Sequence, residues 1–207
     1  MKRRIITAAL LVMATSVFAQ NKPATTDNNK WGIRLRAIAA VPQASSYNLS
    51  GSDVKISTSV VPELDFTYYF SKNIGAELIL GTTHHKVSVD NKTTNTELGK
   101  VWLLPPTLNL QYHVAKGSFL PYVGAGINYT IFYGAKDVNA SLAYKNKAAF
   151  STQLGFDYKL NSKWFLNVDV KKIFLKTNVT VKGTQPTVLN DVKINPFVFG
   201  IGIGTRL

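Results

Sequence analysis

The last residues of the chain, KINPFVFGIGIGTRL (193–207), decide the fold class. The bulky apolar residues of this stretch occupy alternate positions: Phe197, Phe199, Ile201, Ile203 and Leu207. Glycine occupies three of the positions between them: Gly200, Gly202 and Gly204. Successive side chains of a strand point to opposite faces, so the stretch predicts a strand with one apolar face and one nearly bare face. Such a strand fits the wall of a narrow membrane barrel, with lipid outside and a crowded interior.

The first residues, MKRRIITAALLVMATSVFAQ (1–20), have a basic start, a short apolar stretch and small residues at Val17 and Ala19. This is the pattern of a secretory signal peptide that is cut after Ala19. We expect residues 1–19 to be removed and residues 20–207 to form one exported barrel domain. A retained N-terminal membrane helix is the alternative, but the apolar stretch is short for one. The chain has no cysteine, so no disulfide framework is expected.

The composition is strongly basic, with 24 Lys and Arg against 11 Asp and Glu, a net charge of +13. Removal of the signal peptide leaves +10, from 21 basic and 11 acidic residues. A charge of this size occurs in nucleic-acid-binding proteins, but an exported chain meets membrane lipids instead. We therefore expect outer-membrane lipids and lipopolysaccharide as partners, and no nucleic acid.

Apolar and polar residues alternate in eight segments: 31–41, 61–70, 74–84, 104–114, 121–133, 150–160, 164–174 and 193–207. Alternation of this kind predicts strands with one apolar and one polar face. The connectors after Phe70, Val114 and Leu160 are short. The connectors that start near Pro42, Asp90, Gly134 and Lys182 are long and polar. Short turns at one end and long loops at the other are typical of outer-membrane barrels, so we predict an all-β, eight-stranded antiparallel transmembrane β-barrel.

A soluble eight-stranded barrel of the lipocalin type would have the same number of strands. Its apolar residues would point inward, whereas here the glycines share a face with charged and amide side chains. The opposite face has the bulky apolar residues, and Trp, Tyr and Phe concentrate near the strand ends, as in the aromatic girdles of membrane barrels. The pattern favours the membrane barrel and a location in the bacterial outer membrane.

Four stretches carry a family resemblance: LLPPTLNLQYHV (103–114), PYVGAGINYTIF (121–132), LGFDYKLNSKWFLNVDVKKI (154–173) and INPFVFGIGIG (194–204). Through them the chain resembles the outer membrane protein W (OmpW) family of small Gram-negative barrels, over nearly its whole mature length. The family tends to end in an aromatic pattern that closes on Phe, whereas this chain ends in Leu207. The resemblance implies assembly by the barrel-assembly machinery and passive passage of small hydrophobic molecules.

Histidine occurs only as His84, His85 and His113. The adjacent His84 and His85 would point to opposite faces of a strand, so they cannot share a metal ion, and we expect both at a solvated strand end. No spacing of Ser, His and an acid resembles a lipase site, and GAGINY lies within a predicted strand rather than in a nucleotide-binding loop. We expect no enzymatic activity, no catalytic residue, no bound metal and no cofactor.

The polar residues of the periplasmic half of the lumen predict a closed, nearly charge-balanced plug. Its expected members are Arg34, Arg36, Glu63, Asp65, Glu77, His113, Asp157, Lys159, Asp169 and Lys171. Unpaired charges away from bulk water cost several kcal/mol each, so opposite signs should pair. The alternative is a wet lumen in which each charge is solvated.

The lumen-facing residues of the outer half are apolar: Ile38, Ile79, Leu103, Pro105, Phe132, Ile173 and Ile194. Such a ring predicts an apolar vestibule that accepts a small hydrophobic solute from outside, while the plug blocks its straight descent. Pro105 and Pro106 cannot donate ladder hydrogen bonds, so we expect lateral exit into the membrane beside them. The alternative is that the ring only packs the barrel mouth.

Two hypotheses of function remain. One is passive transport of small hydrophobic molecules. The other is a non-conducting structural or surface-interaction barrel whose extracellular loops bind partners, because the interior of an eight-stranded barrel is just wide enough for side chains to fill.

Overall fold

The structure is a computed structural model that describes residues 30–43, 53–90, 95–114, 117–137, 141–182 and 187–207. The expected signal peptide lies outside these residues and stays a prediction. The described residues form fourteen strands. Among them, no helix is long and apolar enough to cross a membrane.

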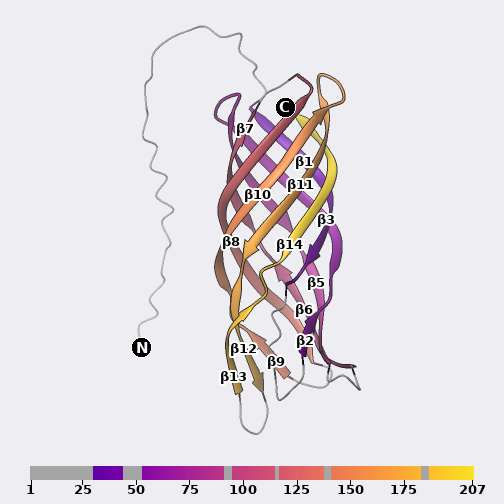
Figure 1. Cartoon of the computed structure of the whole chain (residues 1–207), viewed down its shortest axis with the longest axis vertical. Helices are drawn as coiled ribbons and strands as arrows, with labels where there is room; N and C mark the ends of the chain where they lie inside the picture. The colour runs from indigo at the N-terminus through magenta and orange to yellow at the C-terminus, as the bar shows by residue number, and fades with distance from the viewer. Residues whose placement is uncertain (1–29, 44–52, 91–94, 115–116, 138–140, 183–186) are drawn as a thin grey trace, which may run out of the picture.

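Eight strands form a closed antiparallel barrel, in the order β10-β11-β14-β1-β3-β4-β7-β8 with β8 paired back to β10. Their bounds are β1 Trp31–Val41, β3 Ser59–Tyr69, β4 Ile74–Gly81, β7 Thr107–His113, β8 Phe119–Asp137, β10 Lys147–Lys159, β11 Trp164–Phe174 and β14 Phe197–Arg206. The strands tilt around one long axis, and the C-terminus lies at the end with the short turns (Figure 1). The predicted fold is confirmed. Closure leaves no edge strand in the hydrocarbon, where unpaired backbone groups cost several kcal/mol each.

The glycines of the C-terminal strand are explained by the seam between β1 and β14. Their cross-strand partners on β1 are large lumen-facing residues: Arg34 opposite Gly204, Arg36 opposite Gly202 and Ile38 opposite Gly200. A Cβ at Gly202 would lie 2.2 Å from the Leu35 carbonyl oxygen, a main-chain atom. Glycine on β14 therefore leaves the space that the guanidinium side chains of β1 occupy in a narrow barrel.

The side chains on the outer face of the barrel are apolar and exposed, as a lipid-facing wall requires. Exposed aromatic residues near the short turns include Trp31, Phe70, Tyr112, Tyr158 and Trp164. Exposed aromatic residues at the other end of the strands include Trp102, Tyr133, Phe150 and Phe174. These two bands match the aromatic girdles expected from the sequence.

Six further strands continue the wall beyond the second aromatic band: β2 Asp53–Ile56, β5 Thr83–Asp90, β6 Asn95–Leu104, β9 Ser141–Tyr144, β12 Lys176–Lys182 and β13 Thr187–Lys193. They pair as β2-β5-β6-β8 and as β13-β12-β9, and Figure 1 shows them at the end opposite the C-terminus. The expectation of plain loops after Pro42, Asp90, Gly134 and Lys182 was wrong, because β2, β6, β9 and β13 lie in those connectors, while β5 and β12 precede two of them. Strands beyond the lipid need no continuous apolar face, so their alternation is weak, although Thr and Val are frequent in them.

The expected continuous strand 104–114 is also wrong in one detail, because β6 ends at Leu104 and β7 begins at Thr107. Pro105 and Pro106 lie in the gap and have no N–H to donate. The strand pairing beside these prolines is interrupted as well. The β4–β7 pairing ends at Ile79–Thr107, and the β5–β6 pairing begins at Thr83–Leu103.

Candidate functional site

The periplasmic half of the lumen is filled by a buried network of charged and amide side chains centred on Glu77 of β4. Arg34 of β1 binds it, with Nη2 2.6 Å from Oε1. Arg36 Nη2 lies 3.5 Å from the same oxygen, and Gln111 of β7 donates from Nε2 to Oε2 at 2.7 Å. The carboxylate of Glu77 on β4 thus contacts side chains of β1 and β7. It can do so because the inward-facing side chains of different strands meet in the narrow lumen.

Arg36 contacts three of the four other carboxylates of the network. Its guanidinium lies 2.9 Å from Glu63, 2.7 Å from Asp65 and 2.6 Å from Asp169. The contact of Nε with Asp65 is a charge contact without hydrogen-bond alignment. Lys171 Nζ closes the top of the network, 2.6 Å from Glu63. Each cation is therefore desolvated and held by more than one acceptor, the arrangement that makes buried charges tolerable.

The structure brings together nine of the ten residues expected in the plug: Arg34, Arg36, Glu63, Asp65, Glu77, His113, Asp157, Asp169 and Lys171 are all buried. Lys159 is exposed instead. It is the last residue of β10, so its long side chain reaches water at the rim. Without it the buried part of the predicted plug has five carboxylates and three cations.

Neutral polar side chains that were not among the predicted plug residues complete the network. Gln153 Nε2 donates to Asp169 at 2.7 Å, and Asn167 Nδ2 donates to Asp157 at 2.7 Å and to the Tyr122 hydroxyl at 3.0 Å. All three residues are inward-facing by strand alternation. That parity was the available signal, but parity does not show which polar residues contact one another.

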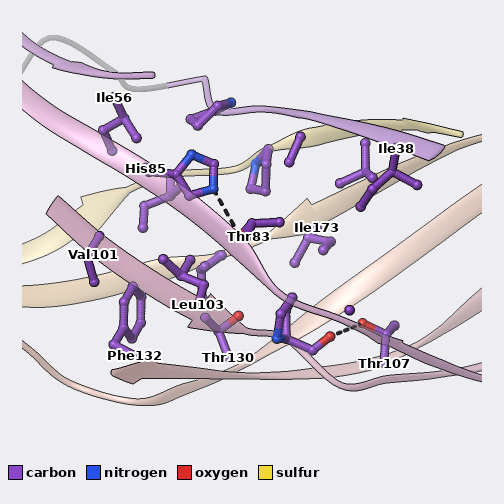
Figure 2. Close-up of a pocket in the computed structure, with 18 of the residues that line it drawn as sticks. Ile38, Ile56, Thr83, His85, Val101, Leu103, Thr107, Thr130, Phe132 and Ile173 are labelled. Atoms are coloured by element: carbon purple, nitrogen blue, oxygen red, sulfur yellow. Dashed lines mark hydrogen bonds between the residues drawn. The ribbon is translucent and has the colours of Figure 1, made fainter. Parts of the chain in front are cut away.

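Above this network the lumen opens into an apolar cavity with an empty volume of about 850 Å³, including the part open to solvent. All seven residues of the expected vestibule line it: Ile38, Ile79, Leu103, Pro105, Phe132, Ile173 and Ile194. Figure 2 shows Ile38 and Ile173 on one side of the cavity and Leu103 and Phe132 on another. The sequence therefore identified a group of residues that the fold brings together around one space.

The cavity is taller than the sequence indicated, because the extension strands add residues to its wall. The added residues are Ile56 of β2, Val87 of β5, Val101 of β6, Tyr144 of β9 and, between β11 and β12, Leu175. Phe132 packs against both apolar clusters of this wall and stacks on Tyr144, with ring centroids 5.2 Å apart. Ile56, Val101 and Tyr144 were missed because their segments were expected to be loops. Val87 and Leu175 were missed because they lie just past the predicted strands 74–84 and 164–174.

His84 and His85 point to opposite faces of β5, as expected. His84 lies outside against Trp102, with ring centroids 4.7 Å apart. His85 is buried in the cavity wall, so the expectation of a solvated position was wrong for it. Its Nδ1 donates to the Ser57 carbonyl at 2.6 Å, and its Nε2 lies 3.0 Å from the Thr83 hydroxyl (Figure 2). The ring is thus fully hydrogen-bonded, and in the described part of the chain no group of three or more His, Cys, Asp or Glu side chains could hold a metal ion.

The cavity floor is where the apolar and charged parts of the lumen meet. Glu63 and Lys171 line the cavity and also belong to the charged network. Thr107 and Thr130 line it at the same junction, and both are hydrogen-bonded to protein groups. A ligand in the cavity would therefore meet an apolar wall on its sides and a closed ion pair beneath it.

Comparison with known proteins agrees with this architecture. The profile of the OmpW family matches residues 30–207. An uncharacterized outer-membrane protein of Sinorhizobium fredii, y4mB, is 42% identical over 182 residues, which cover 85% of this chain and 79% of that protein. Outer membrane protein W of Vibrio cholerae is 32% identical over 222 residues, which cover both chains completely.

The chain is also similar to an operon-encoded protein and to a solved outer-membrane structure, both from Pseudomonas aeruginosa. A Pseudomonas aeruginosa protein named "Dibenzothiophene metabolism operon protein PahQ" is 28% identical over 203 residues, covering 95% of this chain and 94% of its own. The crystal structure of the outer membrane protein OprG from Pseudomonas aeruginosa superposes with a TM-score of 0.78 at 28% identity, covering 86% of this chain and 95% of that one. The overall fold is thus shared with a solved outer-membrane protein over most of both chains.

Proposed function

The chain belongs to the OmpW family of outer-membrane β-barrels, and from that premise we propose that it carries small hydrophobic molecules from the cell surface into the outer membrane. The observation that supports the proposal is the apolar cavity at the outer end of the lumen, lined by all seven residues of the expected vestibule. A wall of Ile, Leu, Val and Phe is not expected in a water-filled pore, whereas burial of apolar surface against it favours binding of an apolar solute. The name of PahQ, which refers to an operon for metabolism of the apolar aromatic dibenzothiophene, is consistent with such a solute.

The expected affinity is low, which suits passage rather than storage. Burial of about 100 Å² of apolar solute surface would stabilise the complex by about 2.5 kcal/mol. Part of this gain is offset by the lost translational freedom of the solute. A solute would therefore bind transiently and leave wherever a path of low resistance exists.

The charged network supports exit through the wall rather than through the floor. Movement down the axis would require separation of buried ion pairs such as Arg36–Asp169, at 2.6 Å, which costs about 3–5 kcal/mol when one partner is lost. The wall beside Pro105 presents less resistance, because the ladder there is interrupted between Ile79–Thr107 and Thr83–Leu103. Gly81 and Pro105 line the cavity at this gap, while Leu80 and Leu104 are exposed on the lipid face.

The transport proposal is tested with the double variant Leu103→Arg, Phe132→Lys, which puts two charges into the cavity wall. Uptake of an apolar aromatic probe into proteoliposomes should be abolished, while heat-modifiable migration in gels shows that the barrel is folded. The matched control is Trp102→Arg, Tyr133→Lys, because these neighbours of the same two residues are exposed on the outer face. Equal uptake by wild type and the folded cavity variant would refute transport through this cavity and favour the non-conducting surface barrel.

Lateral exit has a separate test, because the chain has no cysteine of its own. The flanking register places Gly81 opposite Pro105 across the gap, so Gly81→Cys with Pro105→Cys allows a disulfide to lock the wall. Uptake by this variant should stop on oxidation and return on reduction. Unchanged uptake by the oxidised protein, with the disulfide verified by mass spectrometry, would exclude this exit.

A further inference from the structure

Two lysines face each other on the outside of the wall, just beyond the second aromatic band. Lys176 of β12 and Lys193 of β13 are direct cross-strand partners, and both are exposed. Their chain neighbours Leu175 and Ile194 are buried on the inner side. Because side chains alternate between the faces of a strand, both ammonium groups belong to the outer surface of the wall.

This pair is unfavourable by itself, since like charges directly opposite each other destabilise a sheet. Other lysines of the extension strands have acidic partners: Lys55 lies 2.5 Å from Asp90, and Lys100 lies 3.7 Å from Glu97. Among the ion pairs of the described residues, none includes Lys176 or Lys193. Among the described side chains, no acidic partner thus relieves the repulsion between the two ammonium groups.

A third lysine lies on the same outer face, two positions before Phe174. Lys172 Nζ donates to the Asn195 carbonyl at 2.6 Å and to the Gln43 side chain, and lies 4.0 Å from the centroid of the Phe197 ring. These partners orient the ammonium group but do not neutralise its charge. The three lysines thus form a basic strip that we call the lysine strip: Lys172, Lys176 and Lys193.

The height of the lysine strip identifies what it meets. Phe174 and Phe150 are exposed on the lipid face beside it and pack with ring centroids 6.1 Å apart. Aromatic bands mark the boundary between hydrocarbon and headgroups, so the strip crosses that boundary at the end with the extension strands. A lipid-facing Lys is costly at mid-membrane and nearly free of cost at the interface, and there it lies beside lipid phosphates.

We propose that the lysine strip binds the phosphate groups of a phosphorylated glycolipid of the outer leaflet, on the outer wall formed by β11, β12 and β13. The charge complementarity is direct, because one phosphate between Lys176 and Lys193 turns a repulsive pair into two attractive contacts. Lys172 provides a further positive charge on β11, nearer the middle of the membrane, for a second phosphate of the same lipid. This site is outside the barrel and is independent of the proposed transport function.

The site is tested by native mass spectrometry of the folded barrel in a zwitterionic detergent, with diphosphorylated lipid A as the probe. The variant Lys176→Gln, Lys193→Gln should bind the probe about 30-fold more weakly, since each basic residue at a membrane surface contributes a factor of about five. The variant Lys176→Arg, Lys193→Arg should bind like wild type. The control Lys72→Gln, Lys163→Gln removes the same charge from exposed residues of the short turns and should also bind like wild type.

Thermal unfolding separates lipid binding from a purely structural role. Without lipid A, the Gln double variant should be at least as stable as wild type, because a repulsive pair has been removed. Added lipid A should raise the melting temperature of wild type but not of the Gln variant. The proposal is overturned if lipid A stabilises both proteins equally, if the short-turn control loses as much binding, or if phosphatidylglycerol binds the wild type as tightly as lipid A.

Discussion

Two glycines of β8 provide a sharp test of how the lumen is packed. Gly124 and Gly126 lie two positions apart on the same face of the same strand, so Gly→Ala at each adds the same methyl group to the same wall. At Gly126 the new Cβ would lie 1.9 Å from the Leu108 carbonyl oxygen and 2.7 Å from Asn109 Cα, both main-chain atoms of β7. At Gly124 the nearest atom is Gln153 Oε1, at 3.0 Å, at the end of a flexible side chain.

These distances set the expected cost of each substitution. Real Cβ atoms essentially never approach below 3.0 Å, so β7 and β8 would have to move apart by about 1 Å at Gly126. The local ladder hydrogen bonds would be lost at about 1 kcal/mol each, in addition to about 1–3 kcal/mol for overpacking. We expect Gly126→Ala to lower the free energy of unfolding by about 3–4 kcal/mol. Gly124→Ala should cost less than about 1 kcal/mol, because an amide moves and the unfolded chain loses the freedom of a glycine.

The assay is reversible urea unfolding of the barrel in lipid vesicles, followed by tryptophan fluorescence and by heat-modifiable migration in gels. Trp31, Trp102 and Trp164 all report on insertion, because they are exposed on the lipid face. Equal unfolding midpoints for the two alanine variants would refute the reasoning. That outcome would mean that β7 and β8 are not held at the distance that excludes a Cβ.

Three further predictions follow from the charged network and the topology. Glu77→Ala should lower the free energy of unfolding by about 3–5 kcal/mol, because the buried Arg34 would lose its nearest carboxylate, at 2.6 Å, and keep the more distant Asp157, at 3.6 Å; urea unfolding measures it, and a cost below about 1 kcal/mol would show that the lumen is hydrated. The wild-type barrel should give no large steady ionic conductance in planar bilayers, since the network from Arg34 to Lys171 closes the lumen; steady ohmic currents would contradict a closed floor. Single cysteines at the exposed Lys145 and Lys72 should differ in intact cells, with only Lys145→Cys labelled by an impermeant maleimide; labelling of Lys72→Cys alone would invert the topology.

The lysine at the end of β10 shows where sequence reasoning about the lumen stops. Alternation assigned Lys159 to the same face as Asp157, which is buried in the network. The assignment of the face says nothing about depth, and Lys159 is the last residue of its strand. A long flexible side chain at a strand end reaches water at little cost, so its charge does not enter the network.

The partners within the network are a second example. The sequence predicted that Arg36 would lie in the lumen among acids, but four carboxylates from β3, β4 and β11 meet it: Glu63, Asp65, Glu77 and Asp169. Their positions in sequence are far from one another, and their distances depend on strand order, register and tilt. The same is true of Ile56 and Val101, which join the cavity only because the extension strands pair above the membrane.

The sequence by itself determined the fold class, the lipid and lumen faces of each barrel strand, and the seven apolar residues that surround the cavity. Each of these depends on the two-residue period of a strand and on the compulsory closure of a sheet in lipid, which are local or universal properties. Only the tertiary structure decided the ion-pair partners, the height of the cavity wall, the interruption of the ladder beside Pro105 and the contacts that require Gly126 and Gly202. These depend on distances between strands that are remote in sequence, and such distances are defined only when the barrel closes.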